Sequence, residues 1–158
     1  MLNQPVPDFE LVSTSNKIFR LSEAPARNLV IYFYPKDNTP GCTTEGQGFG
    51  DEHDEFSKLE CDIVGISRDS IRSHESFKMK MGFPFELLSD TDETACKLFN
   101  VMRMKNMYGK QVRGIERSTF VLDAKRILRR EWRGVKVAGH VQEVLEFVKT
   151  LNTESHEP

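Results

Sequence analysis

The feature that most constrains this fold is a run of six strand-forming apolar residues, Leu29-Val30-Ile31-Tyr32-Phe33-Tyr34. A run without polar alternation predicts a strand that is buried on both faces, as in a sheet covered by helices on each side. Pro35 ends the run, because proline lacks the N–H that a sheet ladder requires. Residues 63–66 form a second apolar stretch and predict a second buried strand.

Helical patterns separate these strands. Phe49 and Phe56 recur at near-helical spacing and predict a helix that follows Pro40. Asp69 or Ser70 can cap a second helix, since short polar side chains accept hydrogen bonds from the free N–H groups of a first turn. The first half of the chain therefore predicts strands alternating with helices.

The second half of the chain adds shorter elements. We expect a short strand at 87–88, a helix from Asp90, a loop at 103–114, two strands at 118–122 and 127–132, and a helix at 139–151. The order predicts an α/β fold with a parallel core and an antiparallel edge. This is the thioredoxin-like plan with a short αβ insertion. A β-hairpin at 8–11 and 18–21 precedes it.

The length of 158 residues suits one domain. We expect a single domain at 1–151 and a flexible polar tail at 152–158. The net charge of −2 argues against a dedicated nucleic-acid binder, and the basic stretch 125–130 is interpreted as exposed strand faces. No apolar run reaches the ~18 residues of a membrane span. The N-terminus lacks the features of a secretory signal, so we expect a cytoplasmic protein without a membrane or nucleic-acid partner.

Three cysteines, Cys42, Cys61 and Cys96, are too few and too far apart for a disulfide scaffold. They form no CxxC pair, and no histidine stands at zinc-ligand spacing from them, so we expect no metal and no cofactor. His74 and His140 have no evident acid partner and are interpreted as structural.

Cys42 departs from the pattern of a structural cysteine. It follows the carboxyl end of a buried strand, where α/β sheets place their ligands. Thr39 and Pro40 predict a helix start, with Thr39 at the N-cap and Pro40 at the first helical position. Cys42 then occupies the third helical position, among unpaired N–H groups at the positive pole of the helix. This placement favours the nucleophilic thiolate over the thiol.

Dithiol exchange through the residue three positions later is excluded, because that residue is Glu45. A single activated thiolate beside the Thr39 hydroxyl suits attack on a peroxide O–O bond, which yields a cysteine sulfenic acid. The reaction needs a fixed cation for the thiolate and for the leaving oxygen. Arg117, at the start of a predicted strand, can contact sulfur and peroxide together through its two-pronged guanidinium.

The segment Pro35-Lys36-Asp37-Asn38-Thr39-Pro40-Gly41-Cys42-Thr43-Thr44-Glu45 resembles the active-site motif of the peroxiredoxins, most closely the Q-type group, the bacterioferritin comigratory proteins. The resemblance covers nearly the whole chain and implies the peroxiredoxin fold. It implies that Cys42 attacks the peroxide, that Thr39 and Arg117 complete the pocket, that Pro35 and Pro40 shape it, and that Glu45 holds Arg117. It further implies reduction of hydrogen peroxide and organic hydroperoxides, with thioredoxin, glutaredoxin or glutathione as reductant, by a monomer.

The sequence departs from the family at both usual positions of the resolving cysteine, which are occupied by Gln47 and Lys78. We therefore expect a one-Cys mechanism, in which an external thiol reduces the sulfenic acid on Cys42. The alternatives are an atypical disulfide from Cys42 to Cys96 or Cys61, and a peroxide-sensing or chaperone-like module with little turnover. Three glycines, at 46, 48 and 50, either weaken the helix that carries Cys42 or allow close packing.

Overall fold

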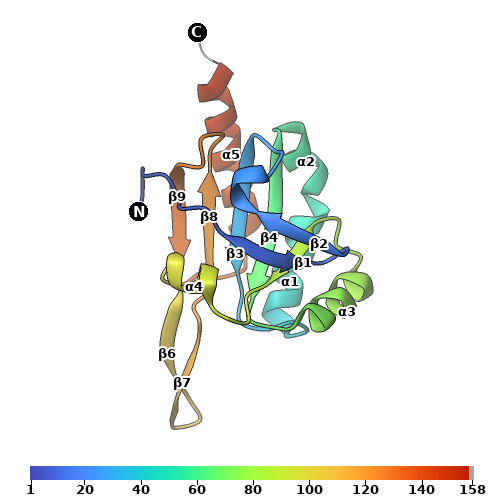
Figure 1. Cartoon of the computed structure of the whole chain (residues 1–158), viewed down its shortest axis with the longest axis vertical. Helices are drawn as coiled ribbons and strands as arrows, with labels where there is room; N and C mark the ends of the chain where they lie inside the picture. The colour runs from blue at the N-terminus through green and yellow to red at the C-terminus, as the bar shows by residue number, and fades with distance from the viewer. Residues whose placement is uncertain (157–158) are drawn as a thin grey trace.

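The computed structural model describes the backbone of residues 1–156 and the side chains of residues 1–154. In this part of the chain, a seven-stranded sheet crosses the molecule in the order β2-β1-β5-β4-β3-β8-β9 (Figure 1). Its strands are β1 (Glu10–Ser13), β2 (Lys17–Arg20), β3 (Asn28–Phe33), β4 (Cys61–Ser67), β5 (Glu86–Ser89), β8 (Ser118–Leu122) and β9 (Leu128–Arg133).

The sheet has the predicted mixture of directions. Strands β3, β4 and β5 are parallel, whereas β8 and β9 continue the sheet beyond β3 as an antiparallel edge. Every residue of β3 is buried, which explains its continuous apolar run. The N-terminal hairpin joins the same sheet, because β1 pairs antiparallel with β5. The α/β fold class is confirmed.

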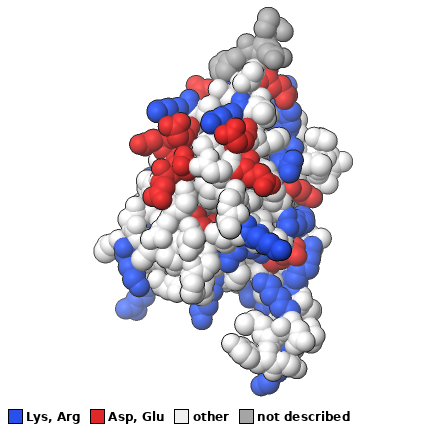
Figure 2. Space-filling model, turned by 180° about the vertical axis from the view of Figure 1, so that it is seen from behind, with Lys and Arg blue, Asp and Glu red and all other residues white. Residues whose placement is uncertain are grey.

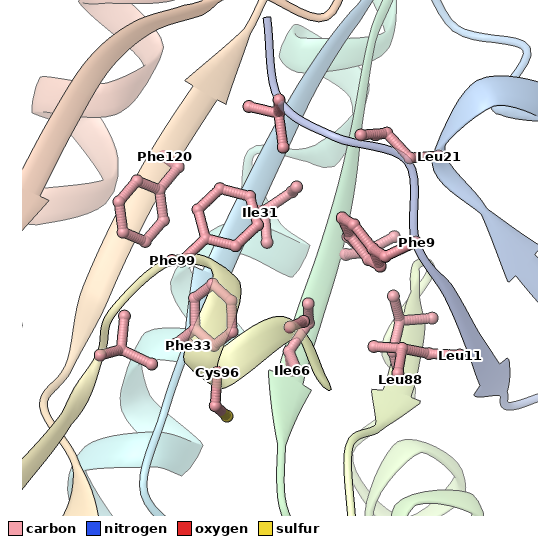
Figure 3. Packing of buried hydrophobic residues seen from close by; sticks show 14 of the residues in the cluster. Phe9, Leu11, Leu21, Ile31, Phe33, Ile66, Leu88, Cys96, Phe99 and Phe120 are labelled. Atoms are coloured by element: carbon pink, nitrogen blue, oxygen red, sulfur yellow. The ribbon is translucent and has the colours of Figure 1, made fainter. Parts of the chain in front are cut away.

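The helices are α1 (Pro40–Asp51), α2 (His53–Lys58), α3 (Ile71–Met81), α4 (Thr94–Leu98) and α5 (His140–His156), with a 3-10 turn, η1, at Leu21–Glu23. The core consists of one apolar cluster on each face of the sheet. Phe33 contributes to the cluster that includes Phe99 and Cys96 near α4 (Figure 3). Tyr32 points to the other cluster, which contains Cys42 of α1 and Val144 of α5.

Residues 103–114, which were expected to form a loop, instead form most of a hairpin. Strands β6 (Met102–Met107) and β7 (Lys110–Ile115) pair antiparallel and extend away from the body of the molecule (Figure 1). Tyr108 and Gly109 make the two-residue turn with φ of 54° and 78°, the left-handed geometry that suits tight hairpins. Most side chains of both strands are exposed or half-buried, so the hairpin has no core-facing apolar alternation that could predict it.

The last helix is longer than expected. Helix α5 continues to His156, so the predicted tail is helical over residues 152–156, and residues 157–158 lie outside the described part. A salt bridge of 2.7 Å between Arg129 and Glu154 ties this last segment to β9. The described chain contains no helix with the length and apolar character needed to cross a membrane.

Candidate active site

The helix that carries Cys42 begins directly beyond the carboxyl end of β3. Thr39 is its N-cap residue, Pro40 takes the first helical position, and Cys42 the third, as predicted. The Thr39 side chain does not cap the helix; its Oγ1 instead donates a hydrogen bond of 2.8 Å to the carbonyl of Lys36. The hydroxyl oxygen retains lone pairs that can accept a hydrogen bond from a ligand.

Arg117 joins the thiol to a carboxyl group. Its Nη2 lies 3.3 Å from Sγ of Cys42, and its Nη1 donates a hydrogen bond of 2.7 Å to Oε1 of Glu45. Sheet register explains how residues 75 positions apart meet. Ser118, the first residue of β8, pairs with Phe33, the last residue of β3, so Arg117 is delivered to the edge where α1 begins.

Glu45 is fully buried one turn after Cys42. Burial raises the pKa of its carboxyl to about 7, and the attraction of Arg117 opposes this shift only in part. Its Oε1 accepts from Arg117, whereas its Oε2 has no hydrogen-bond partner. The carboxyl therefore fixes Nη1 of the guanidinium and leaves Nη2 to contact Cys42.

Cys42 is only 2% exposed and belongs to the cluster of Tyr32 and Phe49. The guanidinium and the N-terminal N–H groups of α1 stabilise negative charge on a sulfur at this position. Because the sulfur is buried, solvent screens these attractions only weakly. Pro35 is half-buried in the preceding loop. Pro40 is exposed and lines a groove with Val137 and Ala138.

The other two cysteines are not brought to this site. Cys96 lies in the apolar cluster on the opposite face of the sheet. Cys61 pairs with Asn28 at the start of β3, whereas Cys42 follows the end of that strand at Phe33. Six extended residues span roughly 15–20 Å, well beyond the ~7 Å between Cα atoms that a disulfide allows. Burial also raises the pKa of both thiols, so neither is an activated nucleophile.

Of the glycines at 46, 48 and 50 in α1, the first two stand where a Cβ would be crowded. A Cβ on Gly46 would stand 2.5 Å from Cζ of Phe83. This is a steric clash, and the ring of Phe83 would have to move to remove it. A Cβ on Gly48 would be 3.0 Å from Val141, whereas the same atom on Gly50 would meet Pro84 at an ordinary 3.4 Å. Glycine at 46 therefore lets α1 approach the segment after α3.

His74 has an acid partner that no local sequence pattern indicates. Its Nδ1 lies 2.7 Å from Oδ2 of Asp37, in the loop just before Cys42. The two residues are 37 positions apart, and no spacing rule links them. The expectation that His74 has no acid partner is therefore wrong. His140 begins α5 as expected, and its Nε2 lies 2.8 Å from Oγ1 of Thr119.

Most arginines of the basic stretch 125–130 have intramolecular roles. Arg126 donates to the carbonyls of Ala24 and Ala26, and Arg129 pairs with Asp123 and Glu154. The guanidinium of Arg130 lies over the ring of Trp132.

Known proteins resemble this chain over most of its length. The AhpC/TSA family model matches residues 2–131. The Peroxiredoxin Bcp of Xanthomonas campestris is 57% identical over 121 residues, which cover 77% of this chain and 76% of that protein. The Peroxiredoxin Bcp of Bacillus subtilis is 43% identical over 151 residues, 96% of each chain.

The similarity extends to three dimensions. A solved structure of the Xanthomonas campestris bacterioferritin comigratory protein superposes with a TM-score of 0.86 at 49% identity. The match covers 91% of this chain and 92% of that one. The structures of that protein are trapped intermediate and ligand complexes, and they concern its alkyl peroxide reduction activity.

Proposed function

This chain belongs to the AhpC/TSA family as a peroxiredoxin of the Bcp type and is a thiol-dependent peroxidase. From that premise we propose that Cys42 is the thiol that attacks the peroxide and that it works without a resolving cysteine. The observation that carries the proposal is the guanidinium of Arg117, which spans the sulfur of Cys42 and the buried carboxyl of Glu45.

The first half-reaction oxidises Cys42. The thiolate attacks the terminal oxygen of the hydroperoxide, an S–O bond forms and the O–O bond breaks. Cys42 becomes a sulfenic acid, and the departing hydroxide or alkoxide takes up a proton and leaves as water or alcohol.

Two groups stabilise this transition state. Arg117 lies against the sulfur and can also donate to the peroxide oxygens, where negative charge develops. The Thr39 hydroxyl donates its hydrogen bond to the backbone carbonyl of Lys36, so its oxygen is left to accept a hydrogen bond from the O–H of the peroxide. Glu45 acts through Arg117 and is a positioning residue, and Pro35 and Pro40 shape the approach to the pocket.

The second half-reaction uses an external thiol. Its thiolate attacks the sulfenic sulfur, the S–O bond breaks, and a mixed disulfide and water form. A second thiol then attacks the mixed disulfide and releases reduced Cys42, so two thiols are oxidised for each peroxide reduced. The separation of Cys42 from Cys61 and Cys96 supports this one-Cys route over an internal disulfide.

The substrates of the proposal are hydrogen peroxide and organic hydroperoxides, in keeping with the alkyl peroxide reduction described for the Xanthomonas campestris relative. Thioredoxin, glutaredoxin or glutathione serves as the reductant. We place the enzyme in the cytoplasm as a monomer.

Steady-state peroxide consumption with reduced thioredoxin tests the proposal. The wild type and the double variant Cys61→Ser/Cys96→Ala should turn over at similar rates, whereas Cys42→Ser should not turn over. Loss of turnover in the double variant would favour an internal resolving cysteine. A flat trace with thioredoxin, glutaredoxin and glutathione, despite oxidation of Cys42, would favour a peroxide sensor.

A further inference from the structure

The loop that leads to Cys42 is tied to α3 through one buried carboxylate, Asp37. Its Oδ1 accepts a hydrogen bond of 2.6 Å from Oη of Tyr34, and its Oδ2 accepts one of 2.8 Å from Oγ of Ser73. The same Oδ2 lies 2.7 Å from Nδ1 of His74. The backbone N–H of Asp37 donates to Oδ2 of Asp69 at 3.0 Å. The loop is thus held by the start of α3 and the residues just before it.

The surroundings of His74 define its charge. The side chain is completely buried, Nδ1 faces the Asp37 carboxylate, and Nε2 lies 2.9 Å from the carbonyl oxygen of Leu88. Both neighbours are acceptors, so both ring nitrogens carry protons when Asp37 is ionised. Burial raises the pKa of Asp37, but the contacts with His74, Tyr34 and Ser73 outweigh burial and lower it. The two side chains therefore form a buried hydrogen-bonded pair, which is an ion pair when the imidazole carries both protons.

The ion pair lies close to Cys42 along the chain. Asp37 is two residues before the N-cap residue Thr39 and five before Cys42. Asp37 cannot separate from His74 without leaving an unpaired charge in a buried site. Release of the loop is therefore costly. The first turn of α1 is thus anchored by a group outside the helix.

The second half-reaction requires that turn to move. Cys42 is 2% exposed, so the thiol of a protein reductant cannot approach the sulfenic sulfur in line with the S–O bond while the turn is closed. A small peroxide needs the opposite, because the closed turn holds the sulfur beside Arg117.

We infer that the Asp37–His74 ion pair is a clamp: it keeps the first turn of α1 closed for the reaction with peroxide and sets how often the turn opens for the reducing thiol. Both residues are positioning residues, since neither touches the reacting atoms. The inference rests on the proposed function of Cys42 and adds a control on the balance between its two half-reactions.

Separate measurement of the two half-reactions tests the clamp. Reduced protein is mixed with hydrogen peroxide, and the sulfenic form with reduced thioredoxin; acid quench and intact mass give each rate. In His74→Gln, which can bond Leu88 but carries no charge, an open fraction raised about tenfold should accelerate reduction by about tenfold, whereas peroxide oxidation should slow only by the smaller factor by which the closed fraction falls. Ser73→Ala should shift both rates in the same directions by less.

A matched control separates the clamp from general destabilisation. Phe99→Leu weakens the apolar cluster on the opposite face of the sheet and should leave the ratio of the two rates at the wild-type value. Hydrogen exchange of the amides of residues 41–46 should quicken in His74→Gln and not in Phe99→Leu. If His74→Gln fails to fold, Asp37→Asn and Ser73→Ala carry the test.

The clamp and the proposed function fail in different ways. Wild-type protein that is not oxidised at Cys42 by peroxide would refute the proposed function. Normal oxidation of the wild type with an unchanged rate ratio in His74→Gln, Asp37→Asn and Ser73→Ala would refute the clamp alone. Nitrogen NMR of the wild type near pH 7 should show both ring nitrogens of His74 protonated; a neutral ring would overturn the ion pair.

Discussion

Nη2 of Arg117 lies 3.3 Å from Sγ of Cys42, while Nη1 of the same guanidinium lies 2.7 Å from Oε1 of Glu45. One planar group thus bridges the sulfur of Cys42 and a fully buried carboxyl. The arrangement depends on the antiparallel pairing of β8 with β3, which brings the residue before β8 to the helix that follows β3. The surroundings of Cys42 are therefore set by the sheet as well as by its own helix.

Replacing Arg117 tests this bridge. Arg117→Lys keeps a positive charge but lacks the two guanidinium nitrogens that contact the sulfur and the carboxyl together. Oxidation of Cys42 by peroxide should therefore slow by about 10²-fold, the usual effect of losing one donor to the transition state. Arg117→Met should be slower still. Arg130→Lys is the control and should react normally, because the contact of the Arg130 guanidinium is with the ring of Trp132. A normal rate for Arg117→Lys would contradict the bridging role.

Replacing Thr39 tests the acceptor role of its hydroxyl. Thr39→Val keeps the shape but removes the oxygen, so peroxide oxidation should slow by about 10–100-fold, and Thr39→Ser should recover most of the rate. Thr44→Val is the control in the same helix, because Oγ1 of Thr44 donates to the carbonyl of Pro40 at 3.0 Å. Equal rates for the two valine variants in stopped-flow experiments would refute the role.

Glu45 should make the folded protein less stable as pH rises. Its pKa is raised from 4.5 to about 7 by burial, so the folded state holds a proton that the unfolded state loses between these values. This group's contribution to the free energy of unfolding therefore falls from pH 4.5 to 7, by an amount on the order of 3 kcal/mol.

Glu45→Gln removes this titration and keeps an acceptor for Arg117. Urea unfolding of wild type and variant across that pH range should show the variant gaining relative stability as pH rises. The comparison also cancels the contribution of His140, whose pKa burial lowers to about 4, since both proteins carry it. A stability difference that stays constant with pH would contradict the raised pKa of Glu45.

Gly46 should resist substitution by alanine. The added Cβ would stand 2.5 Å from Phe83, whose ring is confined by Phe77 and Phe85 at centroid distances of 5.0 and 5.2 Å. The free energy of unfolding should drop by about 1–3 kcal/mol, the usual cost of overpacking. Gly50→Ala is the control and should be neutral or gain up to ~1 kcal/mol from helix propensity. Equal stabilities for the two variants would show that Gly46 is not needed for packing.

Much of the fold and of the site is encoded locally and could be predicted. The apolar run of β3 identifies its burial on both faces, and Thr39 with Pro40 marks the first turn of α1. Arg117 could be named because its motif was recognisable, although its contact with Cys42 is made through sheet register, which residue spacing alone does not specify.

The unpredicted features depend on tertiary contacts. His74 finds Asp37 only when α3 lies against the loop after β3, and neither residue has a local signature of the pairing. The β6–β7 hairpin is stabilised by its backbone ladder and its turn, not by an apolar face, so its polar composition is also typical of a loop. Helix α5 extends beyond its apolar stripe, and Glu154 in this extension pairs with Arg129 on β9.

The most direct test of a one-Cys peroxidase at Cys42 is the intact mass of reduced protein after treatment with about one equivalent of peroxide. The mass of the wild-type protein should rise by one oxygen, and that gain should be absent in Cys42→Ser. Loss of two hydrogens in the wild type would mean an internal disulfide and contradict the one-Cys route. Absence of any change that depends on Cys42 would contradict its role as the peroxide-reactive thiol.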